Sequence, residues 1–167
     1  PMTKTVLITG AAHRIGRAVA QGLAEDSWRV IIHYSNSGQA ANELAQNITE
    51  KGGNAATLQA NLADALETAS LISRAVEIAG PLSALINNAS VFERDEVTTL
   101  SDDSWDMHLN VNLKAPAILM RDFAKQAQAG SNIINIIDQR VWRLNPDFIS
   151  YTVSKTGLWT LTQTFAQ

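Results

Sequence analysis

The stretch Thr5-Val-Leu-Ile-Thr-Gly-Ala-Ala-His-Arg-Ile-Gly16 decides the fold. Its first part, Thr5–Thr9, is an unbroken run of apolar and β-branched residues, which predicts a strand covered on both faces. The glycine turn that follows opens a helical pattern over Arg14–Glu25. In that setting the backbone can approach a pyrophosphate, and the helix N-terminus supplies free N–H groups. The stretch therefore predicts a nucleotide site formed by Gly10, His13, Arg14, Ile15 and Gly16.

The same alternation of apolar runs and helical patterns continues along the chain and predicts a doubly wound α/β fold. Further strands are expected at Arg29–His33, Ala55–Ala60, Ala84–Asn88 and Ile133–Ile137. Further helices are expected at Gly38–Lys51, Asp64–Ala79, Ser101–Gln128 and Ser150–Ala166. Right-handed crossovers place the strands in the order 3-2-1-4-5, in a single Rossmann-type domain over residues 1–167. Pro116 predicts a distortion inside the fourth helix, because proline has no N–H to donate.

Composition limits the class of partner. With 46% hydrophobic and 17% charged residues, the 167-residue chain has ordinary globular composition. A net charge of −3 gives no reason to expect a nucleic acid or an anionic membrane, and the absence of cysteine excludes disulfides and thiolate metal sites. No run approaches the roughly twenty apolar residues of a membrane span, and the start lacks the long apolar run of a signal peptide. We therefore expect a soluble cytoplasmic protein that binds a small molecule and no metal.

The segment after the second strand indicates which dinucleotide is bound. An NAD site needs a carboxylate at this point to accept both ribose hydroxyls. Here the first acid is Glu43, and His33 is interpreted as a strand-end histidine without a cofactor role. The hydroxyl and amide groups that precede Glu43 suit a 2′-phosphate, which predicts NADPH as the cofactor. These groups belong to Tyr34, Ser35, Asn36 and Ser37.

Tyr151 and Lys155 are four residues apart and therefore share one face of the last helix. A phenol has a pKa of about 10, and a nearby ammonium lowers that pKa by favouring the phenolate. The pair thus predicts a proton donor, Tyr151, with Lys155 as its activator. Asp138 lies between the fifth strand and this helix. An ionised aspartate cannot donate a hydrogen bond and repels an oxyanion, so it suits a substrate that carries N–H groups.

From residue 2 to the last, the chain resembles the short-chain dehydrogenase/reductase family. The resemblance rests on the glycine turn and on three further motifs, Asn87-Asn-Ala-Ser90, Asn110-Val-Asn-Leu-Lys-Ala-Pro116 and Tyr151-Thr-Val-Ser-Lys155. It implies that Asn112 holds a water in the proton relay and that Lys155 also binds the nicotinamide ribose. It also implies a homotetramer built on the fourth and fifth helices. Further cofactor contacts implied by the resemblance are Asn61, Leu62, Asn88, Ala89 and Ser90.

Several positions are similar to those of one subgroup, the pteridine reductases. The family usually has serine at Asp138 and glycine at Arg14 and Ser90, whereas pteridine reductases resemble this chain at these positions. The resemblance implies hydride transfer to a pterin-type C=N bond, with substrate contacts from Arg14, Ser90, Phe92, Asp138 and Tyr151. The subgroup usually carries a basic residue where His13 and Asn36 stand, which weakens the expected preference for NADPH.

Two other functions stay open. The first is reduction of 3-oxoacyl thioesters or small ketones, with Asp138 a tolerated substitution; the second is NADPH binding without catalysis. Arg14, Phe92 and Asp138 could also be ordinary surface or core residues. Family members are about half as long again, with two further strands that are absent here. We therefore expect a fragment, or the ordered part of a longer protein, in which the fifth strand is an exposed edge.

Overall fold

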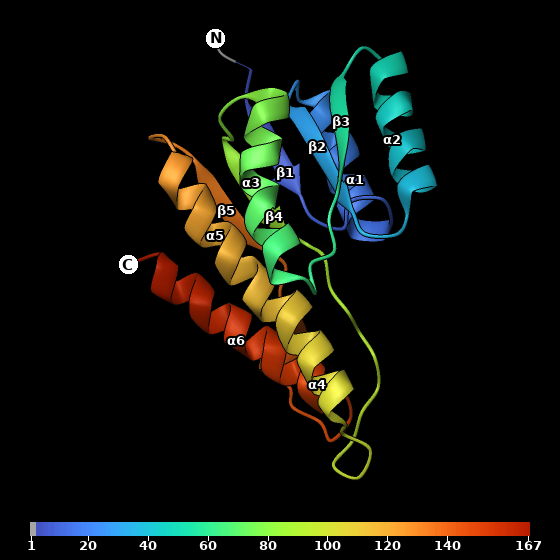
Figure 1. The fold of residues 1–167 in the computed structure, drawn as a ribbon, viewed down its shortest axis with the longest axis vertical. Coiled ribbons are helices and arrows are strands. Elements are labelled where there is room, and N and C mark those ends of the chain that lie inside the picture. The colour runs from blue at the N-terminus through green and yellow to red at the C-terminus, as the bar shows by residue number, and fades with distance from the viewer. Residues whose placement is uncertain (1–2) are drawn as a thin grey trace.

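The computed structural model describes residues 3–167 and contains one five-stranded sheet in the order β3-β2-β1-β4-β5 (Figure 1). All neighbouring strands pair in parallel. The strands are β1 (Thr5–Ile8), β2 (Arg29–Tyr34), β3 (Asn54–Gln59), β4 (Ala84–Asn87) and β5 (Asn132–Asn135). The predicted strand order is therefore confirmed, and the expected ends of the strands lie within two residues of those observed.

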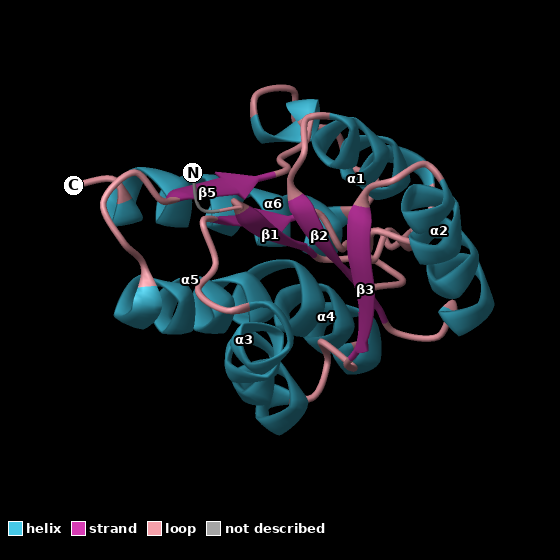
Figure 2. Cartoon of the chain, turned by 90° about the horizontal axis from the view of Figure 1, so that it is seen from above, coloured by secondary structure: helices cyan, strands magenta, loops and turns pink. Residues whose placement is uncertain are grey.

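Helices cover both faces of the sheet, as the view from above shows (Figure 2). The helices are α1 (Arg14–Glu25), α2 (Gly38–Glu50), α3 (Ala65–Ala79), α4 (Asp102–Leu109), α5 (Ala115–Gln126) and α6 (Ile149–Phe165). A short 3₁₀ turn, Gln139–Val141, precedes α6 and was not predicted. No helix within residues 3–167 is both long enough and apolar enough to cross a membrane.

Two apolar cores form because successive side chains of a strand point to opposite faces. Leu7 of β1 packs into the core beneath α3, α5 and α6, whereas Val6 and Ile8 pack into the core beneath α1 and α2. All residues of β1 are buried, which explains why the sequence of this strand shows no polar alternation.

The predicted fourth helix is divided by a π-helical segment, Asn110–Lys114, between α4 and α5. The N–H of Ala115 bonds to the carbonyl of Asn110, five residues back. Pro116 has no N–H for the carbonyl of Asn112, so regular α-helical bonding cannot continue at this point. The expected distortion is thus confirmed, and it lies just before the proline.

β5 forms one edge of the sheet and pairs with β4. Ile134 of β5 is 47% exposed, so the edge strand carries an apolar side chain that the described residues leave half open to solvent. The edge strand expected from the sequence is therefore present.

Candidate functional site

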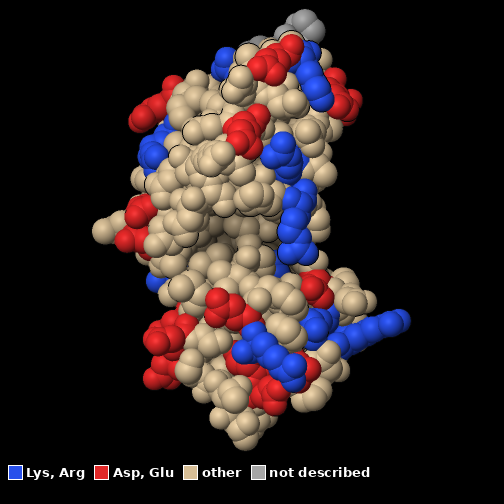
Figure 3. All heavy atoms as spheres, turned by 90° about the vertical axis from the view of Figure 1, so that its right-hand side faces the viewer, with Lys and Arg blue, Asp and Glu red and all other residues tan. Residues whose placement is uncertain are grey.

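A cavity of about 820 Å³ lies at the carboxyl ends of the strands. Its volume is in the range of small-molecule sites, and its place is the usual one in doubly wound sheets. Figure 3 shows a hollow at mid-height on this face, with basic side chains along one margin. Among the predicted site residues, the cavity is lined by Gly10, His13, Arg14, Ile15, Ser35, Asn36, Asn61, Leu62, Asn88, Ala89, Ser90, Phe92, Asp138, Tyr151 and Lys155. Sequence reasoning did not identify His33, Ala63, Val91, Met107, Val111, Ile136 and Ile137, which also line it.

The glycine turn between β1 and α1 has the shape of an anion-binding loop. Gly10 has φ +61°, and a Cβ built there would lie 2.8 Å from the Cα of Ala89. Arg14 has φ +50°, the left-handed conformation that glycine adopts most readily, which accounts for the family's usual glycine at this position. Gly16 does not line the cavity. A Cβ on Gly16 would lie 2.6 Å from the carbonyl oxygen of Gly10, so this residue lets α1 pack against the turn.

The N-terminus of α1 is open toward the cavity. His13 is the N-cap, and its side chain makes no capping hydrogen bond. The first N–H groups of the helix are therefore available to an anion, and the helix dipole favours negative charge there. This arrangement fits a pyrophosphate between the helix and the Gly10 turn.

His33 holds the glycine turn in place. The Gly10 N–H donates to Nδ1 of His33 at 3.0 Å, so Nε2 carries the proton and donates to the Ala60 carbonyl at 3.0 Å. Burial lowers the pKa of His33 to about 4, which keeps the ring neutral and suited to both bonds. The sequence interpretation of a strand-end histidine missed this contact. The sequence signal that could have revealed this contact is the place of His33 near the end of β2, because β2 pairs with β1 and the glycine turn follows β1.

The Asn-Asn-Ala-Ser motif joins β4 to the glycine turn. Nδ2 of Asn88 donates to the carbonyls of Thr9 and Gly10 at 3.0 and 3.1 Å. The backbone N–H groups of Asn88 and Ala89 both donate to the Thr9 hydroxyl at 3.0 Å. The motif therefore fixes the floor of the cavity, and its last residue, Ser90, is exposed at the rim.

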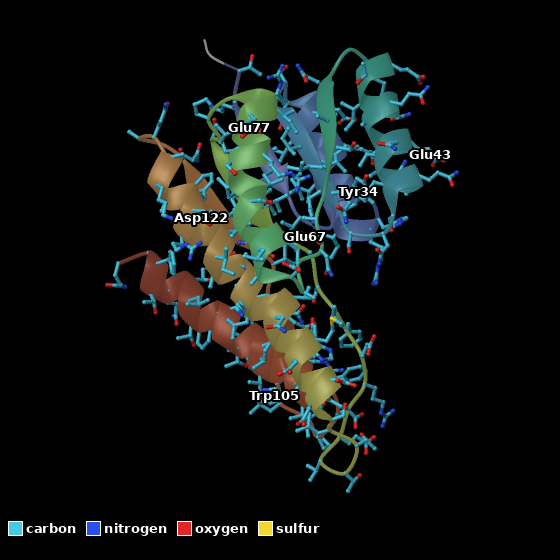
Figure 4. The ribbon with its side chains drawn as sticks, in the orientation of Figure 1. Tyr34, Glu43, Glu67, Glu77, Trp105 and Asp122 are labelled. Atoms are coloured by element: carbon cyan, nitrogen blue, oxygen red, sulfur yellow. The ribbon has the colours of Figure 1, made fainter. Side chains whose placement is uncertain are left out.

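The part of the cavity next to the end of β2 has no acidic side chain among the described lining residues. Ser35 and Asn36 line this end, whereas Tyr34 and Ser37 do not. Glu43 points outward from α2, away from the cavity (Figure 4). Because no carboxylate faces this end, the arrangement matches the predicted 2′-phosphate site better than a site for two free ribose hydroxyls.

Where the segment after β5 meets α6, the Tyr151 hydroxyl donates to Oδ2 of Asp138 at 2.9 Å. Burial raises the pKa of Tyr151 well above its ordinary value, and the hydrogen bond to Asp138 and the charge of that carboxylate raise it further. Ser90 and Arg140 lower this pKa by smaller amounts. The expectation that Lys155 lowers the pKa of the phenol is therefore wrong for this structure. The nearest charge on the hydroxyl is a carboxylate, which favours the protonated phenol.

Lys155 is buried, and its Nζ donates to the Ile136 carbonyl at 2.9 Å. Nζ lies 5.9 Å from the centre of the Tyr151 ring. Burial lowers the pKa of Lys155 to about 8, and the charge of Asp138 opposes part of this shift. Lys155 thus lines the cavity beside Tyr151, where its ammonium can also donate to a ligand.

The Asn112 side chain is fully buried and does not line the cavity. Its Oδ1 accepts from the Val91 N–H at 2.8 Å, while Nδ2 donates to the Val91 carbonyl at 2.9 Å and to the Ser154 hydroxyl at 3.1 Å. These bonds tie the segment after β4 to α6. The side chain is therefore committed to protein contacts and does not itself face the cavity.

Phe92 is 53% exposed and forms an aromatic wall of the cavity. Its ring stacks on Phe148 with a centroid distance of 4.2 Å, and it meets the Tyr151 ring edge-on at 4.6 Å. A buried core position for Phe92 is thus wrong, and a planar ligand could lie against its open face.

Comparison with known proteins agrees with this geometry. A family model described as short chain dehydrogenase matches residues 4–167. The 3-oxoacyl-[acyl-carrier-protein] reductase FabG of Staphylococcus aureus is 32% identical over 99% of this chain and 68% of its own length.

Two solved structures are also similar. The FolM alternative dihydrofolate reductase 1 of Brucella canis, complexed with NADP, is 43% identical with a TM-score of 0.93, over 98% of this chain and 66% of that one. The landomycin C-6 ketoreductase LanV, with bound NADP and rabelomycin, is 31% identical with a TM-score of 0.93, over 98% of this chain and 69% of that one. The chain thus spans about two thirds of the length of these relatives. The fold, the matched residues and the family motifs agree, and the chain belongs to the short-chain dehydrogenase family.

Proposed function

We propose that this protein is an NADPH-dependent reductase that transfers a hydride to the C=N bond of a pterin. The observation that carries the proposal is the carboxylate of Asp138, 2.9 Å from the Tyr151 hydroxyl. An ionised carboxylate attracts the N–H groups of a pterin and repels the oxyanion that forms when a ketone is reduced. The similarity to an alternative dihydrofolate reductase at 43% identity supports the same substrate class.

The residues at the glycine turn fit NADPH. The backbone of Gly10 and the open N-terminus of α1 would hold the pyrophosphate, and Ser35 and Asn36 would face the 2′-phosphate. NADPH, when bound, supplies the hydride. The ammonium of Lys155 would donate to the nicotinamide ribose from its place beside the Ile136 carbonyl.

The remaining site residues would bind the pterin and supply the proton. Phe92 would lie against the flat ring, Asp138 would accept hydrogen bonds from its N–H groups, and Arg14 and Ser90 would contact it at the rim. Addition of the hydride to carbon leaves a pair of electrons on the neighbouring nitrogen. Tyr151 keeps its proton at neutral pH and would give it to that nitrogen, regaining one from solvent. We assign the relay water to the main-chain carbonyl of Asn112, which Pro116 cannot engage.

Reduction of 3-oxoacyl thioesters or ketones is the second candidate function. It is favoured by the similarity to FabG at 32% identity and to LanV at 31% identity. In that case Asp138 would sit beside the reacting oxygen without assisting it, and Tyr151 alone would protonate the alkoxide.

NADPH oxidation by the whole protein distinguishes these functions. We expect turnover with dihydrobiopterin or dihydrofolate to exceed turnover with an acetoacetyl thioester. Faster turnover of the thioester would overturn the pterin proposal in favour of the second candidate. Quenching of tryptophan fluorescence by NADPH without turnover of any of these substrates would instead indicate a binding module.

We also propose a cytoplasmic homotetramer, in which α4, α5 and α6 of neighbouring subunits pack together. Val153 and Phe165 of α6 are 42% and 46% exposed, which leaves apolar side chains available for such a contact. Light scattering of the whole protein after size-exclusion chromatography should give four times the subunit mass. A monomeric mass would contradict this arrangement.

A further inference from the structure

A buried polar network outside the cavity joins the loop after β4 to the beginning of α6. Its members Asp95, His108 and Ser150 are each at most 1% exposed, and none of them lines the cavity. Buried polar groups lower stability unless they are hydrogen-bonded, and a fully bonded network fixes the relative positions of the segments that it joins. The bonds of this network therefore show which segments it holds.

The Asp95 carboxylate caps α6 from a distant part of the sequence. Phe148 is the N-cap of α6, with φ +60° and no capping bond from its own side chain. Asp95 Oδ1 accepts from the Ser150 N–H at 3.2 Å, Oδ2 accepts from the Ser150 hydroxyl, and the Asp95 carbonyl accepts from the Phe148 N–H at 2.8 Å. Burial pushes the pKa of Asp95 upward, but hydrogen bonds from Ser150 and Ser104 outweigh burial and leave this pKa below its ordinary value. The negative charge is thus held at the helix N-terminus, where the helix dipole stabilises it.

His108 connects this cap to α4 and to the loop. The Glu93 N–H donates to Nε2 of His108 at 3.0 Å, so the proton of the ring is on Nδ1. Nδ1 lies 2.8 Å from the Ser150 hydroxyl oxygen and 2.8 Å from the Ser104 carbonyl. The Ser150 hydroxyl therefore accepts from His108 and donates to Asp95. Each donor in this series of hydrogen bonds meets an acceptor, which makes the arrangement specific.

The groups next to this network form the catalytic end of the cavity. Ser150 directly precedes Tyr151, and the His108 ring lies edge-on to the Tyr151 ring at a centroid distance of 6.1 Å. Glu93 directly follows Phe92, whose ring contacts both Tyr151 and Phe148. The network thus anchors both the proposed proton donor and the aromatic wall without touching a ligand.

We infer that Asp95, His108 and Ser150 are positioning residues, which hold the Tyr151 hydroxyl against Asp138 and the Phe92 ring against the cavity. The inference rests on the proposed function for its kinetic consequence. Misplacement of a reacting group by about 1 Å costs roughly 100-fold in rate. The pyrophosphate end of the site is built from other segments, the Gly10 turn and the N-terminus of α1, so the network should affect turnover far more than NADPH affinity.

Asp95→Asn tests the inference, with Asp122→Asn as the matched control. Asp122 lies on α5 (Figure 4), and its pKa is also lowered, by hydrogen bonds from Arg121 and then Lys125, but it lies outside the cavity. In the whole protein we expect Asp95→Asn to lower kcat about 100-fold and to change the Kd for NADPH far less. Ser150→Ala, which keeps the Asp95 backbone contact, should lower kcat in the same direction by less. Unchanged kcat in Asp95→Asn, or equal loss of kcat and NADPH affinity, would overturn the inference.

A second readout does not need turnover. The chain has two tyrosines, Tyr34 and Tyr151, and the carbon-NMR signal of isotope-labelled Tyr151 is assigned by its loss in Tyr151→Phe. Asp95→Asn should move this signal and let the phenol ionise at lower pH, because its hydroxyl leaves Asp138, while the Tyr34 signal stays in place. An unmoved Tyr151 signal would overturn the positioning role. A moved signal in a protein without any reductase turnover would support that role and count against the proposed function alone.

Discussion

The Tyr151 hydroxyl points at the Asp138 carboxylate, to which it donates across 2.9 Å, where the segment after β5 meets the first turn of α6. Burial and this carboxylate together raise the pKa of the phenol, so the pair keeps a proton in the site at neutral pH. Reduction of a C=N bond consumes that proton at nitrogen, and an ionised carboxylate binds the N–H groups beside it. Reduction of a C=O bond creates an oxyanion, which the same carboxylate repels. The contact between Tyr151 and Asp138 thus favours reduction of a C=N bond over reduction of a C=O bond.

Lys155 should set the alkaline limit of activity. Burial lowers its pKa to about 8, against the opposing charge of Asp138. Below this pH the side chain is an ammonium that can donate to the cofactor, and above it the charge is lost. We therefore expect kcat/KM for NADPH to fall by about tenfold per pH unit above that pKa, as measured in a pH–rate profile.

Two variants test whether this alkaline fall in kcat/KM, the alkaline limb of the pH–rate profile, is due to Lys155. Asp138→Asn removes the charge that raises the pKa of Lys155, so the limb should move to lower pH. Lys155→Arg should remove the limb from the measured range, because a guanidinium stays charged. A limb that neither substitution moves belongs to another group.

Gly10→Ala should weaken both the fold and cofactor binding. The position has φ +61°, and the added Cβ would meet the Cα of Ala89 at 2.8 Å. We expect a loss of more than about 1 kcal/mol in the free energy of unfolding, with a higher Kd for NADPH. Gly22→Ala on the exposed side of α1 is the control, because nothing lies within 4 Å of the added Cβ. Gly22→Ala should raise the free energy of unfolding by about 0.5–1 kcal/mol in chemical denaturation. Equal effects of the two substitutions would contradict the special requirement for glycine at Gly10.

His33 should make stability depend on pH. Its pKa is about 4 in the folded protein, lowered by burial from the ordinary 6.5. The unfolded chain therefore takes up a proton that the folded protein excludes. The stabilisation is complete above pH 6.5 and is lost as the pH falls toward 4, by roughly 3 kcal/mol in total. His33→Asn keeps an acceptor for the Gly10 N–H but cannot be protonated. Its unfolding free energy should fall less steeply in this range, and parallel curves for the two proteins would exclude His33 as the cause.

Much of the fold could be predicted because each strand is a short apolar run between turn residues. Runs such as Val30–Ile32 are buried on both faces, and the glycine turn at Gly10 fixed the position of the first βα unit. The π-helical segment before Pro116 was foreseen only as a distortion, because a missing N–H indicates where bonding fails but not how the chain adapts.

The candidate site was predictable where a motif places several residues together. His33 was missed because its partner Gly10 lies in the turn after a different strand, and strand pairing is not written in the local sequence. The pKa of Tyr151 was expected to shift in the opposite direction, because helical spacing placed Lys155 beside the ring but could not show that Asp138 reaches the hydroxyl. The network around Asp95 was missed for the same reason, since its members come from three separate segments.

The effect of Asp138→Ser on the NADPH-dependent reduction of dihydrobiopterin tests the central claim most directly. We predict that the substitution lowers turnover of the pterin by about 100-fold. NADPH affinity should be retained, and turnover of an acetoacetyl thioester should be retained or increased, because serine can donate to a developing alkoxide. Undiminished pterin turnover in Asp138→Ser would contradict the account and leave the carboxylate without a role in substrate choice.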